Sequence, residues 1–357
     1  MEIAWDIDRG EWDRRIAEES AAGHAPLQQD WSYGEATRML GGKALRAAAY
    51  APDGRALALA QFTARPLRFA GIALADWALC SRGPLWLNQP SEAEKSAVYR
   101  ALRRSAPLSR RRAMLFSPDE ASAAPSLTQA GLRRISTGYS TASIDLRQEL
   151  SALEAAMKGK WRNRLRAAER AGASVRAMRP KAGDCGWLLS REEAQRQTNG
   201  YQGLPTAFVE AFRMASEWAD PLAPHGPRPA QSRARRKTAG AKTAARRPAA
   251  LRLFQAELSA AARDPRRGAD AAPEGPAAAM LFLTHGRAAT YHIGWTSDPG
   301  RSIGAHNLLL WNAIQTLKRD GILSLDLGGL DTERGAGVAR FKLGSGAQPM
   351  TLCGTYC

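Results

Sequence analysis

The chain has 357 residues, of which 44% are hydrophobic, and a formal net charge of +17 at pH 7. This length suits two domains of ordinary size, each with its own hydrophobic core. No run approaches the ~18 consecutive apolar residues of a membrane span, and the N-terminal stretch MEIAWDIDRGEWDRR lacks the apolar region of a signal peptide. The four cysteines form no C-x-x-C pair, so the sequence predicts a cytoplasmic protein with free thiols and no metal site.

The positive charge is concentrated in one segment. The stretch RPAQSRARRKTAGAKTAARRP holds eight basic residues and no acidic residue, within a low-complexity insert over residues 220–250. It has no aromatic residue and no aliphatic residue larger than alanine, so it cannot bury itself in a core. We expect either a solvated loop or a flexible arm on a phosphate backbone, and a second irregular run follows over residues 260–276. The charge also fits peripheral contact with an anionic membrane.

Residues 1–145 are predicted to form a mixed α/β domain. The patterns indicate a short helix at WSYGEATRML, two strands around a Pro-Asp-Gly turn and a further strand in ALADWALC. A helix follows at SEAEKSAVYRALRRSA, where Ser91 and Glu94 form a capping box. A buried strand in AMLFSPD, a short helix in SLTQAGL and a strand in TGYSTASIDL complete this domain.

Residues 146–335 are predicted to form a second domain of similar outline. SALEAAMKGKWRNRLRAAERAG is predicted as one helix, which starts at a Ser151–Glu154 capping box and ends at Gly172. Strands in ASVRAM and ALRLFQAEL, two helices before the basic insert and a hairpin around His285–Gly286 follow along the chain. AHNLLLWNAIQTLKRDG is predicted as a helix with one apolar face, and ILSLDLGG as a strand with alternating faces.

The loop before the helix at Ala305 resembles a phosphate-binding loop. It reads Arg301-Ser302-Ile303-Gly304-Ala305-His306. Acetyl-CoA-dependent N-acetyltransferases bind pyrophosphate at this helix start through Gln/Arg-x-x-Gly-x-Gly/Ala. The last position must be small if the backbone is to reach a phosphate. Here that position is His306, which argues against this use.

A glycine-rich stretch, DLGGLDTERGAGVARFKLGSG, contains Lys342. A Walker loop needs Gly-Lys-Ser/Thr leading into a helix, whereas Lys342 precedes Leu-Gly. We therefore predict a strand in VARFKLG, with Phe341 and Lys342 on opposite faces and Lys342 directed into a cleft between the domains.

Several motifs of the C-terminal part indicate a family. A strand closes on Tyr-x-x-Gly-x-Ser/Thr, a helix carries Ala-x-x-Leu-Leu-x-Trp, and Asp-Leu-Gly-Gly and Arg-Phe-Lys-x-Gly follow, all within residues 279–346. In these motifs the sequence resembles the Fem-type peptidoglycan interpeptide-bridge aminoacyltransferases, or lipid II:glycine glycyltransferases. The match is fair over KWRNRLRAAERAGASV and weak before residue 145. The resemblance implies two N-acetyltransferase-like (GNAT-like) domains in tandem, and a tail, residues 336–357, that returns to the first domain.

The resemblance also implies an activity. Fem-type enzymes take an aminoacyl group from aminoacyl-tRNA and place it on an amine of a cell-wall precursor, so we expect a monomeric aminoacyltransferase that forms an amide bond. Lys342 and Asp326 are the predicted catalytic residues. An ester carbonyl attacked by an amine develops negative charge, which an ammonium group at that place stabilises. Lys342 could equally hold the terminal phosphate of tRNA, or be a surface lysine.

The helix around Trp161 carries six basic residues against one acid, Glu169. Because like charges repel at helical spacing, such a face is tolerated more easily when an anion neutralises it. We predict that it binds tRNA phosphates, with a merely solvated face as the alternative. The residues expected to make these contacts are Lys160, Arg162 and Arg164.

The predicted acceptor site departs from the family pattern. Fem-type enzymes hold the acceptor's diphosphate with a lysine where this chain places Thr37 beside Arg38, and with an arginine where this chain has Leu204, shortly before Phe208. A UDP-linked muramyl peptide is therefore disfavoured as the acceptor, and another small or lipid-linked amine becomes plausible. The further residues expected to bind substrate or phosphate are Arg38, Phe208, Tyr291, His292 and Trp295.

Two other functions stay open. One is an acyl-CoA-dependent N-acyltransferase that acts on a small amine, and the other is a non-catalytic RNA-binding protein on the same fold. The histidines show no ligand spacing, and no Ser-His-Asp order stands out. We expect no metal and no cofactor besides the donor, which is aminoacyl-tRNA or, in the alternative, acyl-CoA.

Overall fold

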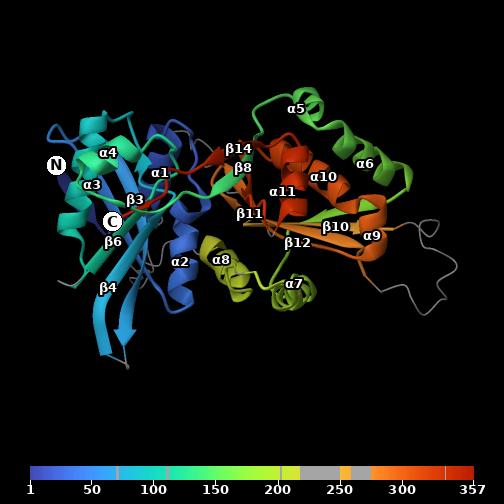
Figure 1. The fold of residues 1–357 in the computed structure, drawn as a ribbon, viewed down its shortest axis with the longest axis horizontal. Coiled ribbons are helices and arrows are strands. Elements are labelled where there is room, and N and C mark those ends of the chain that lie inside the picture. The colour runs from blue at the N-terminus through green and yellow to red at the C-terminus, as the bar shows by residue number, and fades with distance from the viewer. Residues whose placement is uncertain (70–71, 110–111, 202, 218–249, 259–274, 334) are drawn as a thin grey trace, which may run out of the picture.

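The computed structural model describes residues 1–69, 72–109, 112–201, 203–217, 250–258, 275–333 and 335–357. Nearly all of the predicted basic insert, 220–250, and of the predicted loop, 260–276, lies outside these residues. Two lobes lie side by side, each built on its own sheet, which we call the first and the second lobe (Figure 1).

An eight-stranded sheet organises the first lobe. Its order is β1-β2-β3-β4-β6-β15-β7, and β5 pairs with β3. β4 and β6 run parallel, whereas the other pairs are antiparallel. The strands are β1 (Glu2–Trp5), β2 (Lys43–Tyr50), β3 (Ala56–Phe69), β4 (Ile72–Ser81), β5 (Leu85–Trp86), β6 (Arg112–Ser117), β7 (Arg134–Ser136) and β15 (Thr355–Tyr356).

Helices cover both faces of this sheet. Trp12 and Trp31 pack on one face, whereas Tyr99 and Leu127 pack on the other. The predicted capping box of Ser91 with Glu94 is present and starts α3. The helices are α1 (Arg9–Glu19), the 3-10 turn η1 (Leu27–Gln29), α2 (Trp31–Met39), α3 (Glu92–Ser105) and α4 (Ala124–Gln129).

A seven-stranded sheet of order β14-β8-β13-β12-β11-β10-β9 organises the second lobe. Its core on one face is formed with α5, α6 and α10, and on the other face with α7 and α8. The strands are β8 (Ser140–Asp145), β9 (Ser174–Met178), β10 (Leu251–Glu257), β11 (Ala278–His285), β12 (Ala288–Thr296), β13 (Ser324–Gly329) and β14 (Gln348–Thr351). The helices are α5 (Leu150–Ala156), α6 (Gly159–Arg170), α7 (Gly186–Asn199), α8 (Ala207–Glu217), α9 (Asp298–Ile303), α10 (Ala305–Arg319) and α11 (Ala336–Gly344).

β12 and β13 are parallel neighbours that separate along their C-terminal halves. They pair only from Ala288–Thr290 to Ser324–Asp326, although β12 runs on to Thr296 and β13 to Gly329. A bulge at His292 lies just beyond this pairing, because the register with β11 shifts there. A bulge bends the strand that contains it and ends regular pairing, so the two strands diverge from this point.

Two predicted elements are wrong. The predicted strand VARFKLG is the helix α11, in which Ala339 and Lys342 are buried at the helical spacing of three residues. A short apolar run fits a strand or a buried helix equally well, so the periodicity of this run does not distinguish a strand from a helix. The loop predicted before the helix at Ala305 likewise contains the short helix α9.

The long helix predicted from the Ser151–Glu154 capping box is also wrong, because it consists of α5 and α6. Met157 is extended between them, and the backbone N–H of Lys158 donates to the carbonyl of Gly344, 2.9 Å away. That contact with α11 replaces a bond inside a continuous helix. α5 begins after Glu149 without a side-chain cap.

The two sheets exchange chain segments near the predicted boundaries. The strand Ser140–Asp145, assigned from sequence to the first domain, belongs to the second sheet as β8. In the C-terminal tail, α11 and β14 belong to the second lobe, whereas β15 pairs with β6 and β7 in the first. The tail thus reaches the first lobe through its end, where Cys353 packs on the first core and Cys357 exchanges backbone hydrogen bonds with Arg133.

Candidate functional site

The Lys342 ammonium group lies beside the diverging ends of β12 and β13. It donates a hydrogen bond to the carbonyl of Gly329, 2.8 Å away, and lies 6.0 Å from the centre of the Tyr291 ring. Lys342 is 7% exposed, and the carbonyl that accepts its hydrogen bond has no charge to balance the ammonium. The predicted residue is therefore neither a surface lysine nor a member of a direct ion pair with any described carboxylate.

Burial changes the acidity of this lysine. It lowers the pKa of Lys342 to about 8, and the nearby carboxylate of Asp326 opposes the change. The pKa of the Tyr291 phenol is raised, also through burial. At neutral pH the lysine therefore still carries its charge, in surroundings that solvate an ammonium poorly, and such a charge interacts strongly with a developing anion.

Asp326, the second predicted catalytic residue, bridges the two lobes. One of its oxygens accepts hydrogen bonds from Gly328 N at 2.7 Å and from the Thr141 hydroxyl at 2.9 Å. The other oxygen accepts from the guanidinium of Arg82, which also pairs with Asp119. Burial alone would raise the pKa of Asp326, but Arg82 and these hydrogen bonds outweigh it and lower the pKa. Asp326 is therefore an ionised and fully engaged carboxylate.

A pocket of about 280 Å³ lies between the lobes, next to Asp326. It opens where the parallel strands β4 and β6 of the first lobe end, the place where open α/β sheets commonly bind ligands. Burial lowers the pKa of two lining histidines, to about 3 for His285 and less far for His24, so both are neutral at pH 7. The charged and polar lining comprises Ser20, His24, Arg82, Asp119, Glu120, Ser143, His285, Thr290, Ser324 and Asp326.

The loop that resembles a phosphate site is closed. Ala305 is 0% exposed and Asn307 4% exposed in the first turn of α10, and a Cβ at Gly304 would lie 3.0 Å from the backbone oxygen of Arg164. α6 thus covers the N–H groups that an anion would need to reach at this helix start. His306 forms a hydrogen bond with the Trp295 carbonyl, 3.0 Å away.

The basic residues of α6 do not join Lys342 in one cluster. The predicted stripe of Trp161, with Leu165 and Ala168, is buried. Lys160 and Arg164 are exposed on the other side of the helix, and Arg162 is half-buried. Trp161 packs on Phe341 of α11 at 5.9 Å between ring centres, so α6 and α11 are neighbours. The exposed cations therefore lie on the outer side of the helix pair and Lys342 on the side of the sheet.

The three predicted β12 residues have different surroundings. Tyr291 lies beside Lys342, as described above. The Nε2 atom of His292 is buried and has no hydrogen-bond partner among the described residues, and burial with Arg196 nearby lowers its pKa to about 4. Trp295 packs edge-on against Trp187 of α7, with the Arg191 guanidinium 4.0 Å from its ring centre. Only Tyr291 therefore contributes directly to the surroundings of Lys342.

The predicted acceptor residues of the first-lobe interface are not grouped around a pocket. Arg38 is 58% exposed and lies 3.7 Å from Glu35. The Thr37 hydroxyl donates to the Tyr33 carbonyl within α2. Phe208 is 1% exposed and packs on Tyr33 across the interface of α2 and α8, at 5.2 Å between ring centres. Phe208 is thus a core residue between the lobes rather than a ligand contact.

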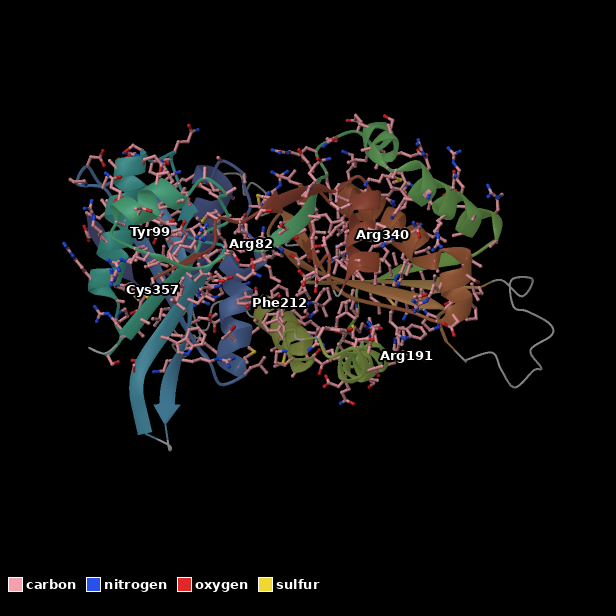
Figure 2. All side chains as sticks on the ribbon, viewed as in Figure 1. Arg82, Tyr99, Arg191, Phe212, Arg340 and Cys357 are labelled. Atoms are coloured by element: carbon pink, nitrogen blue, oxygen red, sulfur yellow. The ribbon has the colours of Figure 1, made fainter. Side chains whose placement is uncertain are left out.

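Sequence reasoning missed Arg82, Asp119 and Thr141. Arg82 directly follows the strand β4 and precedes Gly83-Pro84, and a charged residue at the C-terminal end of a strand is a usable signal for a site. Its partner Asp326 lies 244 positions away, so the sequence could not indicate the pairing. Figure 2 shows Arg82 between the two lobes.

No protein-family model matches the sequence, and no curated protein matches it. Among solved structures, that of FemX matches with a TM-score of 0.72 at 15% identity, over 100% of this chain and 96% of that chain. The chain has the fold of FemX. A tandem GNAT protein from the clavulanic acid biosynthesis pathway matches with a TM-score of 0.50 at 12% identity, over 99% and 98% of the two chains. The predicted α/β fold, two GNAT-like domains in tandem with mixed sheets and flanking helices, is confirmed.

Over the described part of the chain, no helix combines the length and the apolar character needed to cross a membrane.

Proposed function

We propose that this protein is a Fem-type aminoacyltransferase, which moves an aminoacyl group from aminoacyl-tRNA to an amine and forms an amide bond. The observation that carries this proposal is the buried ammonium of Lys342, held by one neutral carbonyl where β12 and β13 diverge. The FemX-like fold and the Arg-Phe-Lys-x-Gly motif support the same conclusion.

The chemistry follows from this charge. The acceptor nitrogen attacks the ester carbon, the carbonyl oxygen becomes an oxyanion, and the ammonium of Lys342 stabilises it. The carbon–oxygen bond to the ribose then breaks, the ribose oxygen takes a proton from solvent and leaves as a hydroxyl group, and the nitrogen loses one proton to solvent. A preorganised charge in a poorly solvated site needs no reorientation during this step, so it lowers the barrier more than a solvated lysine would.

The interdomain pocket suits the acceptor amine. Two lining carboxylates, Asp119 and Asp326, share the single guanidinium of Arg82, while Glu120 pairs with Lys95. With His24 and His285 neutral, the net negative charge of Asp119, Asp326 and Arg82 is offset by the nearby Lys342 ammonium, so the pocket does not repel an acceptor in the neutral amine form that attack requires. The pocket has a volume of about 280 Å³, which suits a small amine or the amine-bearing end of a larger acceptor.

The donor is aminoacyl-tRNA rather than acyl-CoA. α6 exposes Lys160 and Arg164 for contacts with a phosphate backbone. The helix start that would hold the pyrophosphate of a coenzyme A is covered by α6 and buried. An acyl-CoA bound in the usual GNAT manner would have to displace that helix.

The test uses purified protein, a pool of amines and either labelled aminoacyl-tRNA or labelled acyl-CoA. We expect label in an amide product from aminoacyl-tRNA alone. Lys342→Ala should reduce the rate by more than about tenfold, whereas Lys181→Ala, at an exposed lysine before α7, should leave it unchanged. Transfer from acyl-CoA alone, or tRNA binding without any product, would contradict the proposal.

A further inference from the structure

Arg82 has an unusual backbone. Its φ of 54° lies in the left-handed region, which residues with a Cβ rarely adopt. Its N–H donates to the carbonyl of Ser117 at the end of β6, 2.6 Å away, and the residue is 8% exposed. Disfavoured backbone conformations persist where the surrounding structure enforces them, and they gather at functional sites. With this conformation the guanidinium pairs with Asp119 of the first lobe and with Asp326 of the second.

The contacts beyond Arg82 lead to Lys342. The guanidinium binds one oxygen of Asp326, and the other oxygen accepts from Gly328 N and the Thr141 hydroxyl. Gly328 has a φ of 76°, so the chain turns there and presents the next carbonyl to Lys342 Nζ. Asp326 thus fixes both the turn and its own position relative to the lysine.

We propose that Arg82 of the first lobe is a positioning residue, which sets the place and the charge state of Lys342 in the second lobe through Asp326. The effect of Arg82 on catalysis rests on the proposed function, but the link from Arg82 through Asp326 to Lys342 does not. Lys342 then has the position and the charge that the reaction needs only when the two lobes are in contact.

The charges around Lys342 determine in which direction its pKa should shift when a residue of this link is replaced. Tyr291 faces it from β12 and Asp326 from β13, and α6 meets α11 through the apolar contact of Trp161 with Phe341. Asp326 raises the pKa of Lys342 against the effect of burial. Removing the Asp326 charge should therefore lower that pKa, whereas removing the Arg82 charge should raise it. Loosened packing alone would move both variants in the same direction.

The experiment measures the titration of Lys342 itself. Protein labelled with carbon-13 at lysine Cε is titrated by NMR from about pH 6 to pH 10, and the signal of Lys342 is assigned by its loss in Lys342→Arg. We expect a wild-type midpoint near the pKa of about 8. Asp326→Asn should shift the midpoint down by roughly one pH unit and Arg82→Gln should shift it up by a similar amount. Arg82→Lys, which keeps the charge, should leave it nearly in place.

Equal midpoints in wild type and Arg82→Gln, or shifts of both variants in one direction, would overturn the proposal. Should Asp326→Asn fail to fold by circular dichroism, the two Arg82 variants decide alone, because Arg82→Gln must shift the midpoint upward and Arg82→Lys must not. The same variants are assayed for transfer across this pH range, and the alkaline limb of the rate should move with the midpoint. A protein without transfer activity refutes the proposed function, while the titration still tests the link.

Discussion

Replacing Lys342 by methionine tests what burial of its charge costs the fold. The pKa of Lys342 falls from 10.5 to about 8, a difference of 10.5 − 8, or about 2.5 units. At about 1.4 kcal/mol per unit, the buried ammonium costs the folded state on the order of 3 kcal/mol below pH 8. Methionine fills similar space without charge, but it gives up the hydrogen bond to Gly329, worth about 1 kcal/mol. We therefore expect the variant to be more stable than wild type by roughly 1–3 kcal/mol at pH 7.

The pH dependence follows from the same values. The pKa of this lysine is lower in the folded state than in the unfolded state, so between about pH 8 and pH 10.5 the unfolded state binds more protons. Wild-type stability, relative to the variant, then rises with pH. The advantage of Lys342→Met is largest below about pH 8 and disappears toward about pH 10.5.

Guanidinium chloride unfolding, followed by circular dichroism at several pH values, measures both effects. Lys181→Met, at an exposed position, is the matched control and should change stability by less than about 0.5 kcal/mol at every pH. The Lys342 variant should also lose transfer activity, so that stability rises as activity falls. A stability difference of the same size at pH 7 and pH 10, or a wild type that is the more stable at pH 7, would refute the reasoning.

Two further predictions concern charge at other places. Reversing Lys160 and Arg164 to glutamate should weaken tRNA binding and reduce the slope of log K against log salt by about two, measured by filter binding. Lys43→Glu on β2 is the control, and an unchanged slope would show that α6 makes no phosphate contact. Burial lowers the pKa of His285 to about 3 from an ordinary value of 6.5. The unfolded state therefore takes up this proton first as the pH falls, and stability drops between about pH 6.5 and pH 3. His285→Gln should show a smaller fall in melting temperature over this range. A fall equal to that of wild type would show that protonation of His285 does not cause the loss of stability.

Features that depend on neighbouring residues could be predicted from the sequence. The capping box of Ser91 with Glu94 starts α3 because its groups lie three residues apart. α10 buries Leu310, Ile314 and Leu317, as its apolar period indicates. The Arg-Phe-Lys-x-Gly motif likewise pointed to Lys342, which the structure buries beside diverging strands.

Features that depend on distant contacts could not be predicted. α5 and α6 are separate because Lys158 N bonds to the carbonyl of Gly344, far along the chain. Asp326 was predicted to be catalytic from its place in Asp-Leu-Gly-Gly. Its ion pair with Arg82 spans the lobes and carries no local signal, so the sequence could not indicate that this carboxylate is engaged.

The C-terminal strands have a consequence for synthesis of the protein. β14 extends the second sheet, and β15 inserts between β6 and β7 of the first, where Tyr356 is buried in the core. A nascent chain therefore leaves the ribosome with the edges of β6 and β7 unsatisfied until residues 355–356 emerge. Although the first lobe begins at the N-terminus, it cannot complete its sheet before the second lobe has been translated.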